Sequence, residues 1–234
     1  MAEYSFDELR DIIKTLRSEN GCPWDREQTH ESLKPCMREE AAELAASIRI
    51  YKETGDDTNL CEELGDVLLQ VFLHSQIAEE EGRFTIDDVI DSISKKMIRR
   101  HPHVFGSENL ETSGEVLEKW DEIKKKEKEG QPWVTSVLRE IPLELPALMR
   151  AQKVLKKADA FYHMSQNMED TIDNIRQRLD NLKVQSAQDG ESNYDLIGGI
   201  LLDCANLAKL SKIQGEEALI DKLEMLISSL EDKN

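Results

Sequence analysis

Residues 39–66, EEAAELAASIRIYKETGDDTNLCEELGD, contain two acidic turns within an apolar helical pattern. Residues three apart share a face of an α-helix, so Glu40 pairs with Glu43, and Glu63 pairs with Asp66. If the two helices pack side by side, the carboxylates of both pairs converge. Like charges at close range repel, and desolvation adds to the cost, so this arrangement predicts a bound cation.

The nature of the donors indicates which cation that would be. Hard divalent ions prefer oxygen ligands, and Mg²⁺ held by carboxylates is the usual partner of phosphate substrates. The simpler interpretation is a solvated acidic face, which a chain with 33% charged residues can form in many places. Alanine-rich residues 41–46 favour a metal site, because small side chains let two helices approach closely. Gly65 favours it too, because a glycine within a helix costs about 1 kcal/mol relative to alanine, and this cost makes sense if another backbone or a ligand packs against it. Spacing alone leaves both interpretations open.

The composition excludes several classes of protein. The chain has 234 residues and a formal net charge of -18, which argues against a partner with a nucleic-acid backbone. No apolar run is long enough to span a membrane, so no membrane partner is expected. The four cysteines lack zinc-ligand spacing and no signal peptide is recognisable, which predicts free thiols in a cytoplasmic protein.

Helical periodicity continues through most of the chain, and no window alternates with a period of two for long enough to predict a strand. The sequence therefore predicts an all-α fold. In the first half helices are expected near residues 5–16, 33–51, 60–80, 85–100 and 112–128, with a loop at 20–25. In the second half they are expected near 147–160, 168–187, 194–214 and 216–230. A proline-containing linker, 131–146, is predicted to separate domain 1–130 from domain 147–234.

The two halves are predicted to be a degenerate repeat, because residues 64–69 resemble residues 197–202. That register, with an ungapped alignment of the preceding helix, sets each acid opposite a residue that is not acidic: Glu40 opposite Arg178, Glu43 opposite Asn181, Glu63 opposite Leu196 and Asp66 opposite Gly199. The helical pattern is kept while all four carboxylates are lost. The first half therefore holds the complete constellation.

A dense basic group, Lys96, Arg99 and Arg100, stands at the end of the helix expected at 85–100. Cations that complement a helix dipole are a sufficient explanation, but arginine also binds phosphate oxygens bidentately. The matching helix end of the second half, Met225–Ser229, has no cation, and this joint loss favours one shared function. Trp24 is either a stacking platform for a base or a plug in the bundle. Trp120 and Trp133 are interpreted as packing residues.

The order of these motifs closely resembles the MazG nucleoside triphosphate pyrophosphohydrolases. The matching motifs are GCPWDREQTH at residues 21–30, the two acidic turns, and the closing run from Lys96 to Phe105. The resemblance extends over about residues 5–125. Residues 145–152, LPALMRAQ, also resemble the start of the family's second domain.

This resemblance implies an all-α bundle that is completed by dimerisation and that hydrolyses nucleoside triphosphates to the monophosphate and pyrophosphate. By analogy Mg²⁺, or Mn²⁺ as the alternative, is held by Glu40, Glu43, Glu63 and Asp66. Glu39 is then an outer-shell residue or the base, and Lys96, Arg99 and Arg100 neutralise phosphate charge. The second domain can be the more active one in this family. Here its missing acids instead predict a role in packing, dimerisation or regulation.

Two other functions compete with this interpretation. A di-iron carboxylate bundle expects Glu-x-x-His motifs, and neither acidic turn supplies one. A non-catalytic nucleotide-sensing or interaction protein is the remaining alternative, because a sequence does not separate binding from turnover. The base preference of the site is not readable from these residues either.

Overall fold

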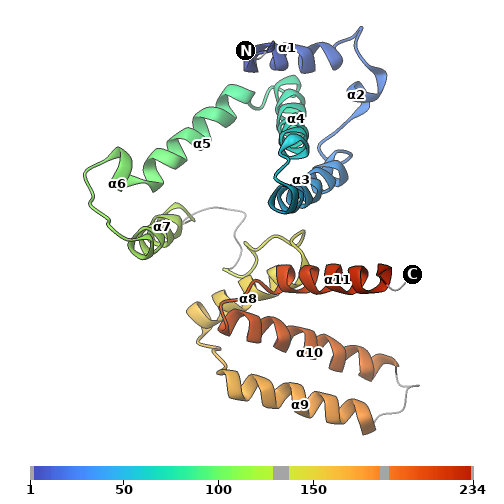
Figure 1. Ribbon diagram of the computed structural model, residues 1–234. Coiled ribbons are helices and arrows are strands. Elements are labelled where there is room, and N and C mark those ends of the chain that lie inside the picture. Colours follow the sequence, from blue (N-terminus) through green and yellow to red (C-terminus); the bar gives the residue numbers. More distant parts are fainter. Residues whose placement is uncertain (1–2, 129–136, 185–189, 233–234) are drawn as a thin grey trace. The chain divides into compact units, whose positions relative to one another are not determined.

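The computed structural model describes residues 3–128, 137–184 and 190–232, and within these ranges every regular element is a helix (Figure 1). This confirms the all-α prediction. The chain divides into two compact units, Met1–Lys124 and Lys125–Asn234. Of the predicted linker, residues 131–136 lie outside the described ranges, and so does Trp133.

The first unit contains the helices that were expected, together with two short ones. Its elements are α1 (Phe6–Leu16), α2 (Pro23–Glu27), α3 (Lys34–Thr54), α4 (Thr58–Glu80), α5 (Ile86–Arg100), α6 (Pro102–Phe105) and most of α7 (Ser113–Lys128), which ends past the boundary at Lys124. The expectation of a loop around Trp24 is wrong, because α2 covers it. Both short helices begin with proline, whose fixed φ suits the first helical position and whose missing N–H is not needed there.

Local signals explain where the long helices begin and end. Ser5 and Glu8 form a capping box at the start of α1, and Thr85 and Asp88 form another at the start of α5. Gly55 follows α3 with φ of 76°, in the left-handed region that glycine adopts without steric penalty. The turn at Gly55 brings α4 back alongside α3, which places the two acidic turns on neighbouring helices.

Helix α4 is the centre of the first unit. It contacts α1, α3 and α5, and its residues Phe72, Leu73 and Ile77 are buried. Phe72 packs on Phe6 of α1 with ring centroids 4.8 Å apart. Burial of large apolar side chains is the main stabilising contribution to such a core. The buried half of α4 anchors the helix, and its first turns carry Glu63 and Asp66.

The run before α3 is fastened to α4 by Arg17, whose side chain is only 5% exposed. Its Nε and Nη2 donate to the Glu80 carboxylate, the latter at 2.8 Å. Its Nη1 donates to the carbonyl oxygens of Asp25 and Gln28. One guanidinium therefore fixes α2 and the following turn against the end of α4.

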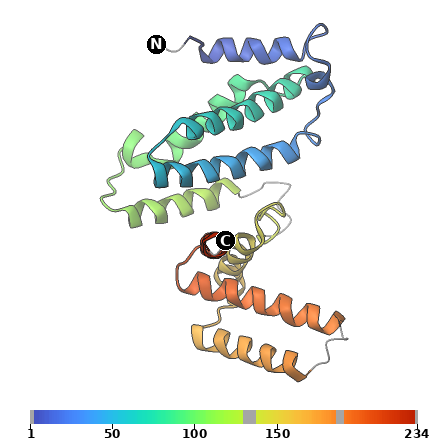
Figure 2. The same ribbon diagram turned by 45° about the vertical axis from the view of Figure 1, so that its right-hand side comes forward.

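The second unit consists of α8 (Ala147–Tyr162), α9 (Met168–Val184), α10 (Gly190–Leu210) and α11 (Gly215–Glu231). Helix α10 contacts α8, α9 and α11, in the same pattern in which α4 contacts α1, α3 and α5. Both views show α9 and α10 side by side (Figures 1 and 2). No helix in the described part of the chain combines the length and apolar character needed to cross a lipid bilayer.

Burial in the two units follows the register of the sequence repeat. In α4 the residues Gln70, Phe72 and Leu73 are buried, and at the same sequence offset α10 buries Asp203, Ala205 and Asn206. Leu33, just before α3, is 1% exposed, and its counterpart Thr171 in α9 is 0% exposed. The helical pairs α3–α4 and α9–α10 can therefore be compared position by position.

Gly65 does not show the close packing that was expected of it. A Cβ atom at this position would meet nothing within 4 Å. The neighbouring Leu64 is 53% exposed, and Ile48 on α3 is 54% exposed. The face of α4 that carries Leu64 and Gly65 is thus left uncovered within the described residues of one chain.

Candidate functional site

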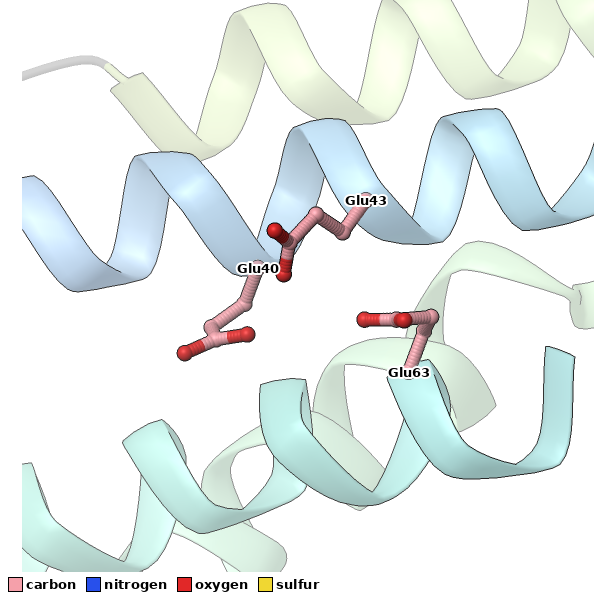
Figure 3. A group of neighbouring side chains, drawn as sticks. All are labelled: Glu40, Glu43 and Glu63. Carbon is pink, nitrogen blue, oxygen red and sulfur yellow. The ribbon is translucent and has the colours of Figure 1, made fainter. Parts of the chain in front are cut away.

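Three of the predicted carboxylates gather between α3 and α4. Glu40 extends from α3 toward α4, the Glu43 side chain runs along α3 toward Glu40, and Glu63 extends from α4 toward α3 (Figure 3). Their nearest oxygens all lie within 4.8 Å of one another. Elsewhere in residues 3–128, 137–184 and 190–232, no other three His, Cys, Asp or Glu side chains form such a group.

Glu63 has one oxygen that is satisfied and one that is not. Its Oε1 accepts a hydrogen bond from Asn59 Nδ2 at 2.9 Å. Its Oε2 is buried and has no hydrogen-bond partner. A buried carboxylate oxygen without a partner is costly, because it has lost water and gained nothing in return. A cation bound between the helices would remove that cost.

Glu40 lies in surroundings that disfavour its charged form. Burial raises its pKa above the usual value, and the nearby charge of Asp66 raises it further, followed by Glu43, Glu63 and Glu39. Asp66 is therefore close to Glu40, although it stands outside the group whose oxygens lie within 4.8 Å. Glu39 is exposed at the edge of the cluster. All five predicted acids belong to one region of negative potential.

The donor set fits a hard divalent cation. It offers carboxylate oxygens only, from two helices, with one buried oxygen unpaired and one carboxyl group held toward its protonated form. Mg²⁺ and Mn²⁺ prefer such ligands, and a bound cation favours the charged form of each carboxylate.

The basic group stands on a different helix from the acids. Lys96, Arg99 and Arg100 occupy the last turns of α5, which contacts α4 and α6 and leads away from α4 toward α6 (Figure 1). Lys96 and Arg100 are half-buried and Arg99 is exposed. Their role in binding phosphate stays a prediction, as does stacking on Trp24, which is 57% exposed on α2.

Trp120 on α7 was predicted to be a packing residue, but two cationic side chains also lie over its ring. The Arg100 guanidinium lies 5.9 Å from its ring centroid and the Lys124 ammonium 5.5 Å. The His101 and Trp120 ring centroids lie 5.5 Å apart with 62° between the ring planes, and the indole Nε1 of Trp120 is buried without an acceptor. The spacing of Trp120 and Lys124 on one helix face was readable from the sequence. The approach of Arg100 from α5 was not.

A second cluster that the sequence did not reveal joins His30 to His74. Their Nδ1 atoms lie 2.8 Å apart and the rings stack with 7° between their planes. The Arg83 guanidinium lies 2.6 Å from His30 Nε2. If Arg83 donates to Nε2, His30 carries its proton on Nδ1 and donates to His74. The cluster fastens the segment before α3 to α4.

A family model matches the part of the chain in which the candidate site lies. The family model described as the MazG nucleotide pyrophosphohydrolase domain matches residues 28–105, which include α3, α4 and α5. All five acids and the basic group of α5 fall within the matched segment. The second unit lies outside it.

Several relatives match nearly the whole chain. Uncharacterized protein YabN of Bacillus subtilis is 43% identical over 98% of this chain, which spans 47% of that protein. The nucleoside triphosphate pyrophosphohydrolase/pyrophosphatase MazG of Thermotoga maritima is 41% identical over 92% of this chain and 79% of its own length. The nucleoside triphosphate pyrophosphohydrolase of Escherichia coli K12 is 39% identical over 91% of this chain and 81% of its own length. The chain therefore belongs to the MazG family.

Proposed function

We propose that this chain hydrolyses nucleoside triphosphates to the monophosphate and pyrophosphate, with Mg²⁺ bound between α3 and α4. The observation that carries the proposal is the convergence of Glu40, Glu43 and Glu63, with Glu63 Oε2 buried and unpaired. The names of the Thermotoga and Escherichia relatives support the reaction class. Family membership alone would not distinguish the two units.

The carboxylates are the residues that would hold the ion. Glu40, Glu43 and Glu63 are close enough to bind together, and Asp66 would join them after a change of rotamer or through water. A bound Mg²⁺ supplies a polarised phosphate and a water of lowered pKa. Glu39 is exposed beside the group, where it can accept a proton from the attacking water or orient it.

The basic group at the end of α5 would bind phosphate oxygens of the substrate. Lys96, Arg99 and Arg100 carry positive charge in a strongly acidic chain, and a triphosphate needs such charge to offset the acids. Arginine side chains match phosphate oxygens in a bidentate fork. Trp120 beside Arg100 and the exposed Trp24 each offer an aromatic face on which a base can stack.

The proposal places one working site in each chain and two chains in each assembly. In the second unit the positions of the four acids hold Arg178, Asn181, Leu196 and Gly199, so these four positions offer no carboxylate to a metal ion. The exposed apolar residues Ile48 and Leu64 support a homodimer, because a second copy would cover them. The assignment also carries the expectation of a cytoplasmic protein.

A pyrophosphate-release assay over common and modified nucleoside triphosphates, with and without Mg²⁺, tests the proposal. Release that requires Mg²⁺ and produces the monophosphate supports it. Triphosphate binding without any release, for every substrate, would indicate the nucleotide-sensing alternative instead. The same panel measures the base preference.

A further inference from the structure

In the second unit a guanidinium fills the space over a helical glycine. A Cβ built on Gly199 of α10 would lie 2.2 Å from Nη1 and 2.4 Å from Cζ of Arg178 on α9. Both distances are far shorter than any contact between non-bonded atoms. A side chain at position 199 would therefore overlap the Arg178 guanidinium where it now lies, and the guanidinium would have to move away from α10.

The guanidinium is also held by a buried acid. Arg178 Nε donates to Asp203 Oδ2 at 3.1 Å, and Asp203 is 7% exposed. Arginine remains charged at every pH at which a protein is folded. A permanent cation thus links α9 to α10, and it neutralises the one carboxylate that is buried beside it.

The position of Arg178 in the repeat corresponds to that of a candidate metal ligand in the first unit. The register that matches burial in the two units sets Arg178 at the position of Glu40 and Gly199 at the position of Asp66. Asp203 falls at the position of Gln70, which is buried in α4. Where α3 and α4 bring acids together, α9 and α10 bring together a cation, a gap that admits it, and one acid that binds it.

We infer that the Arg178 guanidinium takes, in the second unit, the place of the divalent cation between α3 and α4. The α9–α10 pair is then held together by a cationic side chain of the protein itself, and it binds no metal. This inference rests on the proposed function for the location of the metal in the first unit. It explains how the second unit keeps the helical frame after the loss of the acids.

Hydrogen exchange of the full chain, followed by mass spectrometry with and without MnCl₂, tests this directly. Mn²⁺ is expected to slow exchange in peptides of α3 and α4 and to leave those of α9 and α10 unchanged. Arg178→Gln strands the buried Asp203, so exchange in α9 and α10 is expected to rise about tenfold, with or without Mn²⁺. Arg176→Gln is the matched control, because Arg176 is exposed and its ion pair is with Asp173 on its own helix.

A second variant separates the contact from a general weakening of the helix. Gly199→Ala should speed exchange in the wild-type chain, because its Cβ expels the guanidinium. In the Arg178→Gln background the same change should slow exchange, since alanine forms helix better than glycine. This reversal of sign is specific to the Arg178–Gly199 contact.

The outcomes distinguish the inference from the function on which it rests. Protection of α9 and α10 by Mn²⁺, unchanged exchange in Arg178→Gln, or the same sign for Gly199→Ala in both backgrounds would each overturn the inference alone. Failure of Mn²⁺ to protect α3 and α4 would contradict the proposed function, and the comparison with Arg178 would fall with it.

Discussion

Asn59 Nδ2 donates a hydrogen bond of 2.9 Å to Glu63 Oε1, one turn along α4, and leaves Glu63 Oε2 buried and unpaired. The amide fixes the direction in which the free oxygen points. Groups that orient a metal ligand in this way typically raise metal affinity by about 10- to 100-fold. Asn59 is therefore a positioning residue of the candidate metal site.

Replacement of Asn59 gives the first prediction. Asn59→Ala should weaken Mn²⁺ binding by about 10- to 100-fold, because Glu63 loses its orientation while all the acids remain. Isothermal titration calorimetry with MnCl₂ measures the change, and circular dichroism checks that the helices persist. Asn20→Ala, an exposed change in the turn after α1, is the control. Unchanged affinity in Asn59→Ala would show that Glu63 needs no such support.

Glu40 gives a prediction on stability and pH. Burial and the charge of Asp66 raise the pKa of Glu40 above 4.5, so the folded chain without metal takes up this proton more readily than the unfolded chain. The contribution of Glu40 protonation to the stability of the folded chain is fully present below about pH 4.5, and it is lost as the pH rises through the raised pKa of Glu40. Glu40→Gln, which has no charge to lose, should therefore melt a few degrees higher than the wild type at pH 7 in EDTA.

Two further thermal-unfolding measurements sharpen this test, one at lower pH and one with Mg²⁺. The difference between Glu40→Gln and the wild type should shrink as the pH is lowered toward 4.5. Saturating Mg²⁺ should reverse the order at pH 7, because only the wild type gains full binding energy from the ion. A variant that melts below the wild type in EDTA at pH 7 would show that Glu40 is not under electrostatic strain.

The His30–His74 pair predicts a loss of stability in mild acid. Burial, and then the proximity of His30, lower the pKa of His74 below 6.5. This contribution is present above pH 6.5 and is lost as the pH falls through the lowered pKa, because the unfolded chain takes up the proton first. Protonation also removes the hydrogen bond between the rings, which is worth about 1 kcal/mol.

Urea unfolding at pH 7.5 and at pH 5.5 measures this effect. The wild type should lose more free energy of unfolding between the two conditions than His74→Gln, which does not titrate. The nearby charges of Arg83 and Glu81, which pair with each other, are the same in both proteins. An equal loss in the two proteins would mean that the histidine pair does not respond to pH.

Arg17 gives a prediction for the segment before α3. Arg17→Met should reduce the free energy of unfolding by about 2–3 kcal/mol, because the buried Arg17 guanidinium donates to the Glu80 carboxylate and to two carbonyl oxygens, and Met donates to none of them. Lys14→Met is the control, since Lys14 makes an exposed pair with Glu79 at 3.3 Å and should cost less than about 1 kcal/mol. Equal costs for the two variants in urea unfolding would contradict the role given to Arg17.

The sequence predicts those features that depend on local chemistry. Ser5 with Glu8 and Thr85 with Asp88 mark the starts of α1 and α5, because each capping box lies within one turn. The spacing of Glu40 with Glu43, and of Glu63 with Asp66, predicts two acidic helix faces. The turn at Gly55 then leaves little freedom in how those faces meet.

Features that depend on contacts between distant residues are not predictable in this way. The pairing of His30 with His74, the approach of Arg100 to Trp120 and the placement of the Arg178 guanidinium over Gly199 each join two separate segments of the chain. Gly65 shows the converse, since a helical glycine suggests close packing and yet faces open space in one chain. The expected pairing of chains is what would decide whether that surface is covered.

We propose that the carboxylates between α3 and α4 hold the Mg²⁺ on which hydrolysis of nucleoside triphosphates depends. The most direct test is the initial rate of pyrophosphate release at saturating Mg²⁺ for wild type, Glu63→Gln and Asn181→Gln, the last an exposed change at the position that matches Glu43. We expect Glu63→Gln to lose at least about 100-fold in rate with its helical content intact, and Asn181→Gln to match the wild type. Full activity in Glu63→Gln would contradict the account.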